Sequence, residues 1–174
     1  MNRRTLLLSG LVLTAAAATL PARRSAAHAL PLDTVAEYIG VEKGKRRLTL
    51  WHGRQALKTY RIALGFGEPG PKRREGDGRT PEGRYTISGR NPDSAYHLAL
   101  RISYPEPHDI AAASANGWAP GGDIMIHGLP NGLGTLTAMF RRRDWTAGCI
   151  AVTNAEIEEI WRAVPDGTPI EIRP

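Results

Sequence analysis

Short segments of alternating polar and apolar residues, separated by glycine-centred turns, predict a mainly β fold for this chain. Residues 47–51 (RLTLW) alternate in this way, and a turn at residues 52–54 (HGR) separates them from a second such segment at residues 56–64. A strand with one buried face carries apolar side chains at every second position. Together with a strand at residues 38–42, these segments predict an antiparallel meander. Further strands are expected at residues 83–88, 96–102, 123–127 and 168–172.

Two helices are predicted, and the second has the stronger signals. Residues 107–116 hold an alanine-rich run that ends before Gly117. Thr153 is followed three residues later by Glu156, the pattern of a capping box. Four apolar residues then recur at the spacing of one helical face, namely Ile157, Ile160, Trp161 and Val164. The predicted fold is therefore a sandwich-like or barrel-like sheet with one C-terminal helix packed beside Cys149.

The first residues have the features of an export signal. Arg3 and Arg4 precede an apolar run that is too short and too rich in alanine for a convincing membrane span. The order of residues 2–7 (NRRTLL) resembles a twin-arginine signal. Small residues at positions 27 and 29 predict cleavage after Ala29, and residues 25–27 (SAA) form a competing site.

Cleavage after Ala29 divides the chain into a signal peptide, residues 1–29, and one domain, residues 30–174. The second part has the size of a single domain, and residues 30–34 are expected to form a loose lead-in. We therefore expect a protein that is exported to the periplasm or cell envelope and is not stably inserted in the membrane after processing. An uncleaved membrane anchor is the alternative.

The positive charge of the whole chain belongs largely to this leader. The chain carries a formal net charge of +6, and residues 1–29 contain four arginines and no acidic residue, so the remainder carries +2. This balance does not predict a nucleic-acid partner. Two basic runs remain, at residues 72–74 and 141–143, and each is expected to be a solvated loop. The second lies close enough to Cys149 in sequence to meet substrate carboxylates.

Cys149 is the only cysteine, so it cannot form an internal disulfide and is either an inert buried residue or a reactive group. A cysteine nucleophile needs a base, and it needs backbone N–H donors for the developing oxyanion. Gly148 allows close approach of the main chain to a substrate, and His127 is the best candidate base. No cysteine, histidine or carboxylate set has the spacing of metal ligands, so we expect neither a metal nor another cofactor.

Three sequence blocks, in this order, resemble the YkuD-type L,D-transpeptidase catalytic domain. They are residues 76–85 (GDGRTPEGRY), residues 126–128 (IHG) and residues 146–152 (TAGCIAV). The resemblance extends from about residue 38 to residue 174. It implies a peptidoglycan L,D-transpeptidase, in which a cysteine transfers an acyl group from a stem tetrapeptide to an amine acceptor during cell-wall cross-linking or remodelling.

The resemblance also implies a role for each motif residue. Cys149 matches the nucleophile, and His127 matches the general base and acid. Gly128 matches the residue whose backbone carbonyl orients the imidazole. Gly148 and Cys149 match the positions whose backbone N–H groups contribute to the oxyanion hole, and Thr146 supports the geometry of the motif.

Four further side chains are expected to contact the substrate peptide. Trp145 is the strongest of these candidates because it lies four residues before Cys149. The others are arginines, which bind carboxylates well, namely Arg79, Arg141 and Arg143.

Two departures from the family pattern indicate a divergent branch. Members commonly carry a second histidine where this chain has Ala147 and an arginine where it has Ala151, and the 22-residue offset from His127 to Cys149 is slightly long. The first alternative is therefore a cysteine L,D-carboxypeptidase or amidase that uses water as acceptor, on peptidoglycan or on its links to lipoproteins. The second alternative is an inactive cell-wall-binding domain with a structural Cys149.

Overall fold

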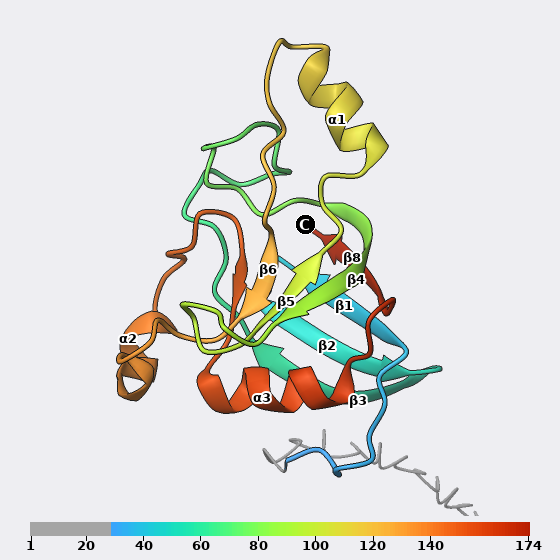
Figure 1. The fold of residues 1–174 in the computed structure, drawn as a ribbon, viewed down its shortest axis with the longest axis vertical. Coiled ribbons are helices and arrows are strands. Elements are labelled where there is room, and N and C mark those ends of the chain that lie inside the picture. The colour runs from blue at the N-terminus through green and yellow to red at the C-terminus, as the bar shows by residue number, and fades with distance from the viewer. Residues whose placement is uncertain (1–28) are drawn as a thin grey trace, which may run out of the picture.

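The computed structural model describes residues 29–174, which form one curled eight-stranded sheet with the order β3-β2-β1-β8-β4-β5-β6-β7 (Figure 1). The β1–β8 and β6–β7 pairs are parallel and the others are antiparallel. The strands are β1 Tyr38–Glu42, β2 Arg47–His52, β3 Gln55–Arg61, β4 Gly83–Asn91, β5 Ala99–Ile102, β6 Met125–His127, β7 Ile150–Ala151 and β8 Pro169–Arg173. The predicted signal peptide, apart from Ala29, lies outside the described residues.

The first and last strands of the sheet order, β3 and β7, are linked by the chain just after β3, so the sheet is barrel-like. Just after β3, Ala63 exchanges two backbone hydrogen bonds of 2.9 and 2.8 Å with Ala151 of β7. Two residues further on, Gly65 bridges Thr146. The prediction of a mainly β, barrel-like fold is therefore confirmed.

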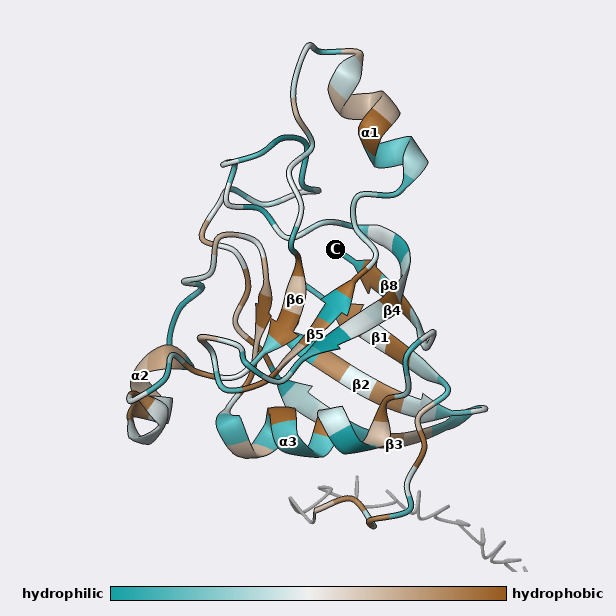
Figure 2. Ribbon diagram, viewed as in Figure 1, coloured by the Kyte–Doolittle hydropathy of each residue, from teal (hydrophilic) through white to brown (hydrophobic). Residues whose placement is uncertain are grey.

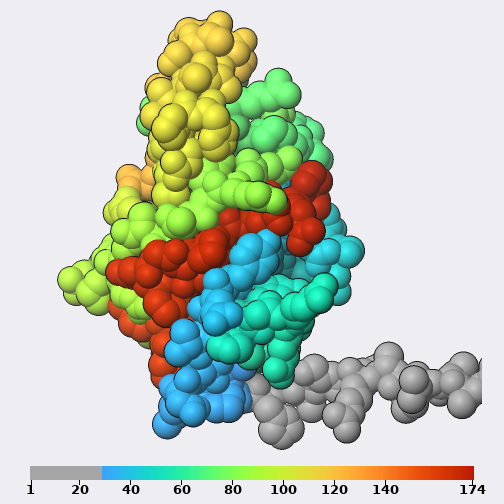
Figure 3. Space-filling model, turned by 90° about the vertical axis from the view of Figure 1, so that its right-hand side faces the viewer, coloured from blue at the N-terminus to red at the C-terminus, as the bar shows by residue number. Residues whose placement is uncertain are grey.

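The core fills the inside of the curled sheet, and the alternation along the strands produces it. In β4, Tyr85 and Ile87 are buried while Arg84 and Thr86 are exposed. Figure 2 shows apolar residues along the central strands, and α3 carries both polar and apolar residues along its length. The N-terminal strand β1 lies beside the C-terminal strand β8, as the space-filling view shows (Figure 3).

The structure contains the two predicted helices. Helix α1 (Pro107–Ser114) projects from the body of the molecule (Figures 1 and 3), and α3 (Asn154–Ala163) packs against β5 and β6. The capping box of α3 is confirmed, because the Glu156 N–H donates to Thr153 Oγ1 at 3.3 Å and the Thr153 N–H donates to Glu156 Oε2 at 2.9 Å. No helix within residues 29–174 combines the length and apolarity needed to cross a membrane.

The apolar face of α3 is narrower than predicted. Ile157 and Ile160 are fully buried, whereas Trp161 is only partly buried, and the Arg90 guanidinium lies 4.9 Å from the centre of its ring. A glutamate, Glu159, takes a buried position instead.

Several predicted boundaries were wrong for reasons of backbone conformation. His97 and Asp123 have positive φ angles of 72° and 54°, so β5 begins at Ala99 and β6 at Met125 rather than at residues 96 and 123. Two short helical turns were not predicted, η1 (Gly134–Leu136) and α2 (Thr137–Phe140). The expected loose lead-in at residues 30–34 was wrong for Leu30, which is buried and belongs to the core, whereas residues 31–33 are exposed.

Candidate active site

The parallel pairing of β6 with β7 places Cys149 and His127 on one face of the sheet. Ile126 lies opposite Ile150, and His127 lies opposite Ala151. Side chains alternate between the two faces along a strand, and Ile126 and Ile150 are both fully buried in the core. Because His127 follows Ile126 and Cys149 precedes Ile150, both of these side chains lie on the other face.

On that face, Cys149 and His127 line the same cleft, which has a volume of about 440 Å³. Its walls include Phe66, Tyr96 and Trp145. The His127 ring packs 4.5 Å from the centre of the Tyr96 ring and 5.7 Å from that of Trp145. The structure thus brings the predicted nucleophile, the predicted base and the predicted substrate contact Trp145 together.

His127 is held in one orientation by its neighbours. The ring is buried, and Nδ1 lies 2.7 Å from the carbonyl oxygen of Gly128. Burial lowers the pKa of His127 below its usual 6.5, although the hydrogen bond to Gly128 acts in the opposite direction. The imidazole is therefore neutral at neutral pH. With the Nδ1 proton donated to the carbonyl, Nε2 is the atom that can accept a proton.

The turn after His127 requires a glycine. A Cβ at Gly128 would lie 2.8 Å from Asn154 Oδ1, the same oxygen that accepts the Leu129 N–H at 2.8 Å. Asn154, at the start of α3, therefore fixes the backbone whose carbonyl contacts the imidazole. Nothing in the sequence pattern marked Asn154, because this contact joins segments that are far apart along the chain.

Cys149 is a protonated thiol in this site. Burial raises its pKa above 9.0, a backbone hydrogen bond from Met125 opposes that shift, and the negative charge of Asp123 adds to it. The thiol donates to the backbone carbonyl of Asp123, with Sγ 3.5 Å from the oxygen. A neutral thiol beside a neutral imidazole needs proton transfer to become a nucleophile.

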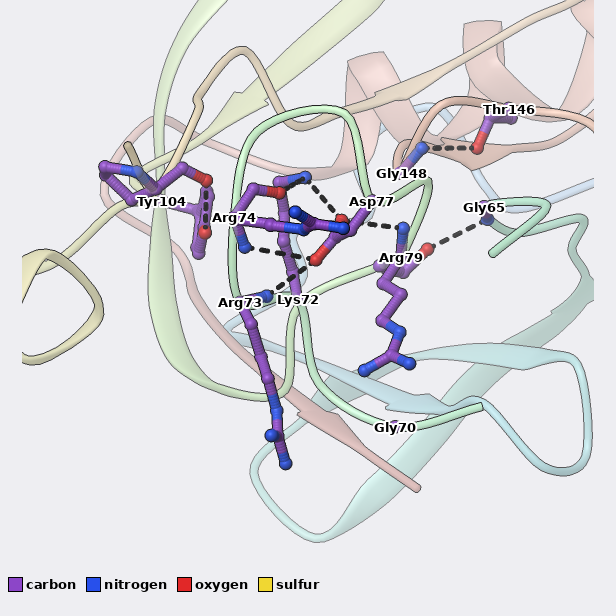
Figure 4. A network of polar contacts seen from close by, with 12 residues as sticks. Gly65, Gly70, Lys72, Arg73, Arg74, Asp77, Arg79, Tyr104, Thr146 and Gly148 are labelled. Carbon is purple, nitrogen blue, oxygen red and sulfur yellow. Dashed lines mark hydrogen bonds and ion pairs between the residues drawn. The ribbon is translucent and has the colours of Figure 1, made fainter. Parts of the chain in front are cut away.

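Thr146 and Gly148 shape the loop that carries the thiol. Thr146 Oγ1 donates to the Cys149 carbonyl at 2.8 Å. It also accepts the Gly148 N–H at 3.2 Å (Figure 4). Gly148 has a φ of 134°, and a Cβ there would lie 2.7 Å from the Arg79 carbonyl oxygen. Only glycine fits this position. Because its N–H already donates to Thr146, an oxyanion would have to share this donor.

The three arginines that were expected to contact substrate do not line the cleft. The Arg79 side chain extends away from Gly148 toward Gly70 and lines a neighbouring cavity (Figure 4). Arg141 pairs with Glu156, and Arg143 lines a separate hollow. Their contact with substrate stays a prediction.

Asp77 organises the loop that precedes Arg79. Its carboxylate accepts backbone N–H groups of residues 73, 74 and 79 and pairs with Lys72 Nζ at 2.8 Å (Figure 4). Burial alone would raise the pKa of Asp77, but these donors lower it to about 2. Lys72 is therefore buried rather than part of a solvated loop.

Within residues 29–174 no group of three or more histidine, cysteine or acidic side chains is placed to hold a metal ion. The cleft instead offers a thiol, an imidazole and backbone groups. Such a set is suited to acyl transfer through a covalent intermediate.

Comparisons with known proteins find relatives in both sequence and structure. YafK from Escherichia coli strain K12, which bears the name putative L,D-transpeptidase, is 34% identical over 134 residues, covering 73% of this chain and 46% of YafK. The crystal structure of the helical cell shape determining protein Pgp2 from Campylobacter jejuni matches with a TM-score of 0.59 and 26% identity, covering 80% of this chain and 48% of that one.

A further solved structure supports the fold alone. The L,D-transpeptidase from Xylanimonas cellulosilytica matches with a TM-score of 0.54 and 16% identity over 82% of this chain and 63% of that one. The chain spans about half the length of YafK and of the Pgp2 structure. The family pattern of the L,D-transpeptidase catalytic domain (YkuD) matches residues 36–172, and the chain belongs to this family.

Proposed function

We propose that the protein is a peptidoglycan L,D-transpeptidase that works through a cysteine thioester. The observation that carries this proposal is the β6–β7 register, which places Cys149 and His127 on one face and in one cleft. The family assignment and the name of YafK support peptide substrates from the cell wall.

In the first half-reaction, His127 Nε2 takes the proton of the Cys149 thiol, and the thiolate attacks the carbonyl carbon of the L-centre residue of a stem tetrapeptide. Backbone N–H groups of residues 148 and 149 stabilise the oxyanion. The amide bond then breaks, and His127 returns its proton to the nitrogen of the departing D-alanine. A thioester on Cys149 remains.

In the second half-reaction, an amine of another stem peptide attacks the thioester carbonyl. His127 accepts the proton of this amine and returns it to the sulfur as the thioester breaks. The thioester conserves the energy of the original amide bond, so the reaction needs no nucleotide and no other cofactor.

A hydrolytic enzyme is the second candidate, and a specific observation favours it. Ala147 lines the cleft beside Cys149, and Ala151 lies directly opposite His127 in the strand pairing. At these two positions family members commonly carry a histidine and an arginine. In this second candidate, methyl groups take the place of both polar groups, and water competes with the amine as acceptor. The protein then acts as a carboxypeptidase or amidase.

The cell wall as substrate agrees with export. We propose that residues 1–29 are a twin-arginine signal peptide that is cleaved after Ala29, and that residues 30–174 work in the periplasm or cell envelope. Stem peptides of peptidoglycan are the expected partners, and nucleic acid is not.

Product analysis tests both candidates. The protein is incubated with a disaccharide tetrapeptide, with and without an amine acceptor, and the products are identified by mass spectrometry. The transpeptidase gives a cross-linked product and free D-alanine, whereas the hydrolase gives a tripeptide in both reactions. A folded protein that gives neither product, like the Cys149→Ala variant, would exclude both reactions on this tetrapeptide. It would leave an amidase that acts on lipoprotein links or the inactive wall-binding domain.

A further inference from the structure

A buried carboxylate on α3 has no part in the proposed chemistry. The side chain of Glu159 is 8% exposed, and its Oε2 accepts from Lys58 Nζ at 2.6 Å and from the Tyr60 hydroxyl at 3.0 Å. Its Oε1 accepts from the backbone N–H of Leu30. Burial would raise the pKa of Glu159, but these donors together lower it, so the group is a carboxylate at neutral pH.

Leu30 is docked on this helix by several contacts besides that one. Its side chain is buried in the core, and its carbonyl accepts from Arg162 Nη2 at 3.3 Å. Further along, the Ala36 N–H donates to the Ala163 carbonyl at 2.7 Å. Leu30 and Ala36 are thus both fixed against the C-terminal half of α3, while residues 31–33 between them are exposed.

The nitrogen that contacts Glu159 is the one that signal cleavage would set free. Hydrolysis of the Ala29–Leu30 peptide bond consumes one water molecule and leaves a carboxylate on Ala29 and an α-ammonium group on Leu30. An uncleaved amide offers one neutral N–H to Glu159, whereas an ammonium offers a positive charge and three donors. A buried carboxylate gains most from a charged, hydrogen-bonded partner.

We propose that Glu159 is the binding site for the α-ammonium group of the mature N-terminus at Leu30. The proposal rests on the cleavage position given under the proposed function. Each carboxylate oxygen then has its own cation, because Oε1 faces Leu30 and Oε2 faces Lys58. Processing would exchange an amide contact for an ion pair and so stabilise the mature domain.

The ion pair predicts a defined pH dependence. The charged or titratable groups that face it are Lys58 and Tyr60 on β3, and Glu156 and Arg162 on α3. A carboxylate partner raises the pKa of the ammonium above its unfolded value of about 8. The added stability is therefore fully present below about pH 8 and disappears as the pH rises through the folded-state pKa.

The experiment compares the unfolding midpoint of two chains that differ only in their start. One begins at Leu30, and the other retains three leader residues, so that its Leu30 nitrogen is an amide. We expect the chain that begins at Leu30 to unfold several degrees higher at pH 7. Glu159→Gln should abolish this difference, whereas the neighbouring control Glu158→Gln, an exposed residue paired with His97, should keep it.

Three results would overturn the proposal. The first is an equal unfolding midpoint for both chains, and the second is a difference that persists in Glu159→Gln. The third is an intact mass of the envelope-processed protein that places its first residue elsewhere than at Leu30. Neither measurement uses catalysis, so failure of the acyl-transfer mechanism would be seen separately in the product analysis. If Glu159→Gln fails to fold, a nitrogen-15 titration of the Leu30 amino group decides, since a pKa at or below about 8 contradicts an ion pair.

Discussion

The two ends of α3 hold two different parts of the molecule by different forces. At its start, Thr153 caps the helix and Asn154 uses a neutral amide to hold the turn that contacts His127. In its second half, Glu159 uses a buried negative charge to hold the backbone N–H of Leu30. Under the proposed mechanism, the start of α3 positions a catalytic group and its second half stabilises the fold, so substitutions at these two places should have separable effects.

The largest loss of activity is expected from substitution of His127, which contacts the turn held by the start of α3. His127→Ala removes the only imidazole that lines the cleft among residues 29–174, so kcat/KM should fall by about a thousandfold. Loss of this buried ring should also lower the unfolding midpoint. The matched control is His52→Ala, an exposed histidine in the turn after β2. Retention of a tenth or more of the activity in His127→Ala would remove this residue from the mechanism.

Asn154→Ala should give the next largest loss of activity. Its comparison with Glu159→Gln tests the start of α3 against its second half. The substitution leaves the Leu129 N–H without its acceptor and frees the carbonyl that orients His127. We expect kcat to fall by roughly tenfold to a hundredfold, with KM nearly unchanged, because misplacing a catalytic group slows the chemical step. Glu159→Gln should lower stability and leave kcat unchanged. Equal effects of both variants on kcat would contradict separate roles for the start and the second half of α3.

The pH dependence of activity and of thiol alkylation tests the protonation states of His127 and Cys149. Because burial lowers the pKa of His127, the acid limb of kcat/KM should lie below pH 6.5. Because burial raises the pKa of Cys149, alkylation of the thiol should accelerate only near and above pH 9. A thiol that alkylates with an inflection near pH 5 would show a preformed thiolate–imidazolium pair instead.

The smallest effect is expected from the cap itself. Thr153→Ala removes the side-chain acceptor for the Glu156 N–H and should lower the free energy of unfolding by about 1 kcal/mol, measured by denaturant titration. Activity should fall less than in Asn154→Ala, since the acceptor for the Leu129 N–H remains. A loss of activity as large as that of Asn154→Ala would assign the positioning role to the cap.

Sequence patterns predicted the parts of the fold that depend on neighbouring residues. Alternation located β2 and β3, and the spacing of Thr153 and Glu156 located the start of α3, because strand faces and helix caps are set within a few residues. Residue chemistry made His127 the candidate base for Cys149, and the family resemblance assigned the two as a pair. No local pattern connects the segments that the β6–β7 pairing joins.

The parts that could not be predicted depend on long-range contacts or on backbone geometry. The Asp123 carbonyl reaches the thiol from a residue with positive φ, and the preference of aspartate for that conformation is too weak to predict it at one position. Leu30 is buried because Glu159 and Arg162, more than 120 residues away, bind its backbone. The direction of the Arg79 side chain, away from the cleft, was equally invisible in the sequence.

The central claim is that Cys149 forms a covalent acyl-enzyme with assistance from His127, and intact-protein mass spectrometry tests it most directly. The protein is incubated with a stem tetrapeptide, or with a carbapenem that mimics the donor, and the adduct is mapped by peptide digestion. We expect one acyl adduct on Cys149, absent in Cys149→Ala and formed far more slowly in His127→Ala. An adduct on another residue, or substantial turnover by Cys149→Ala, would contradict it.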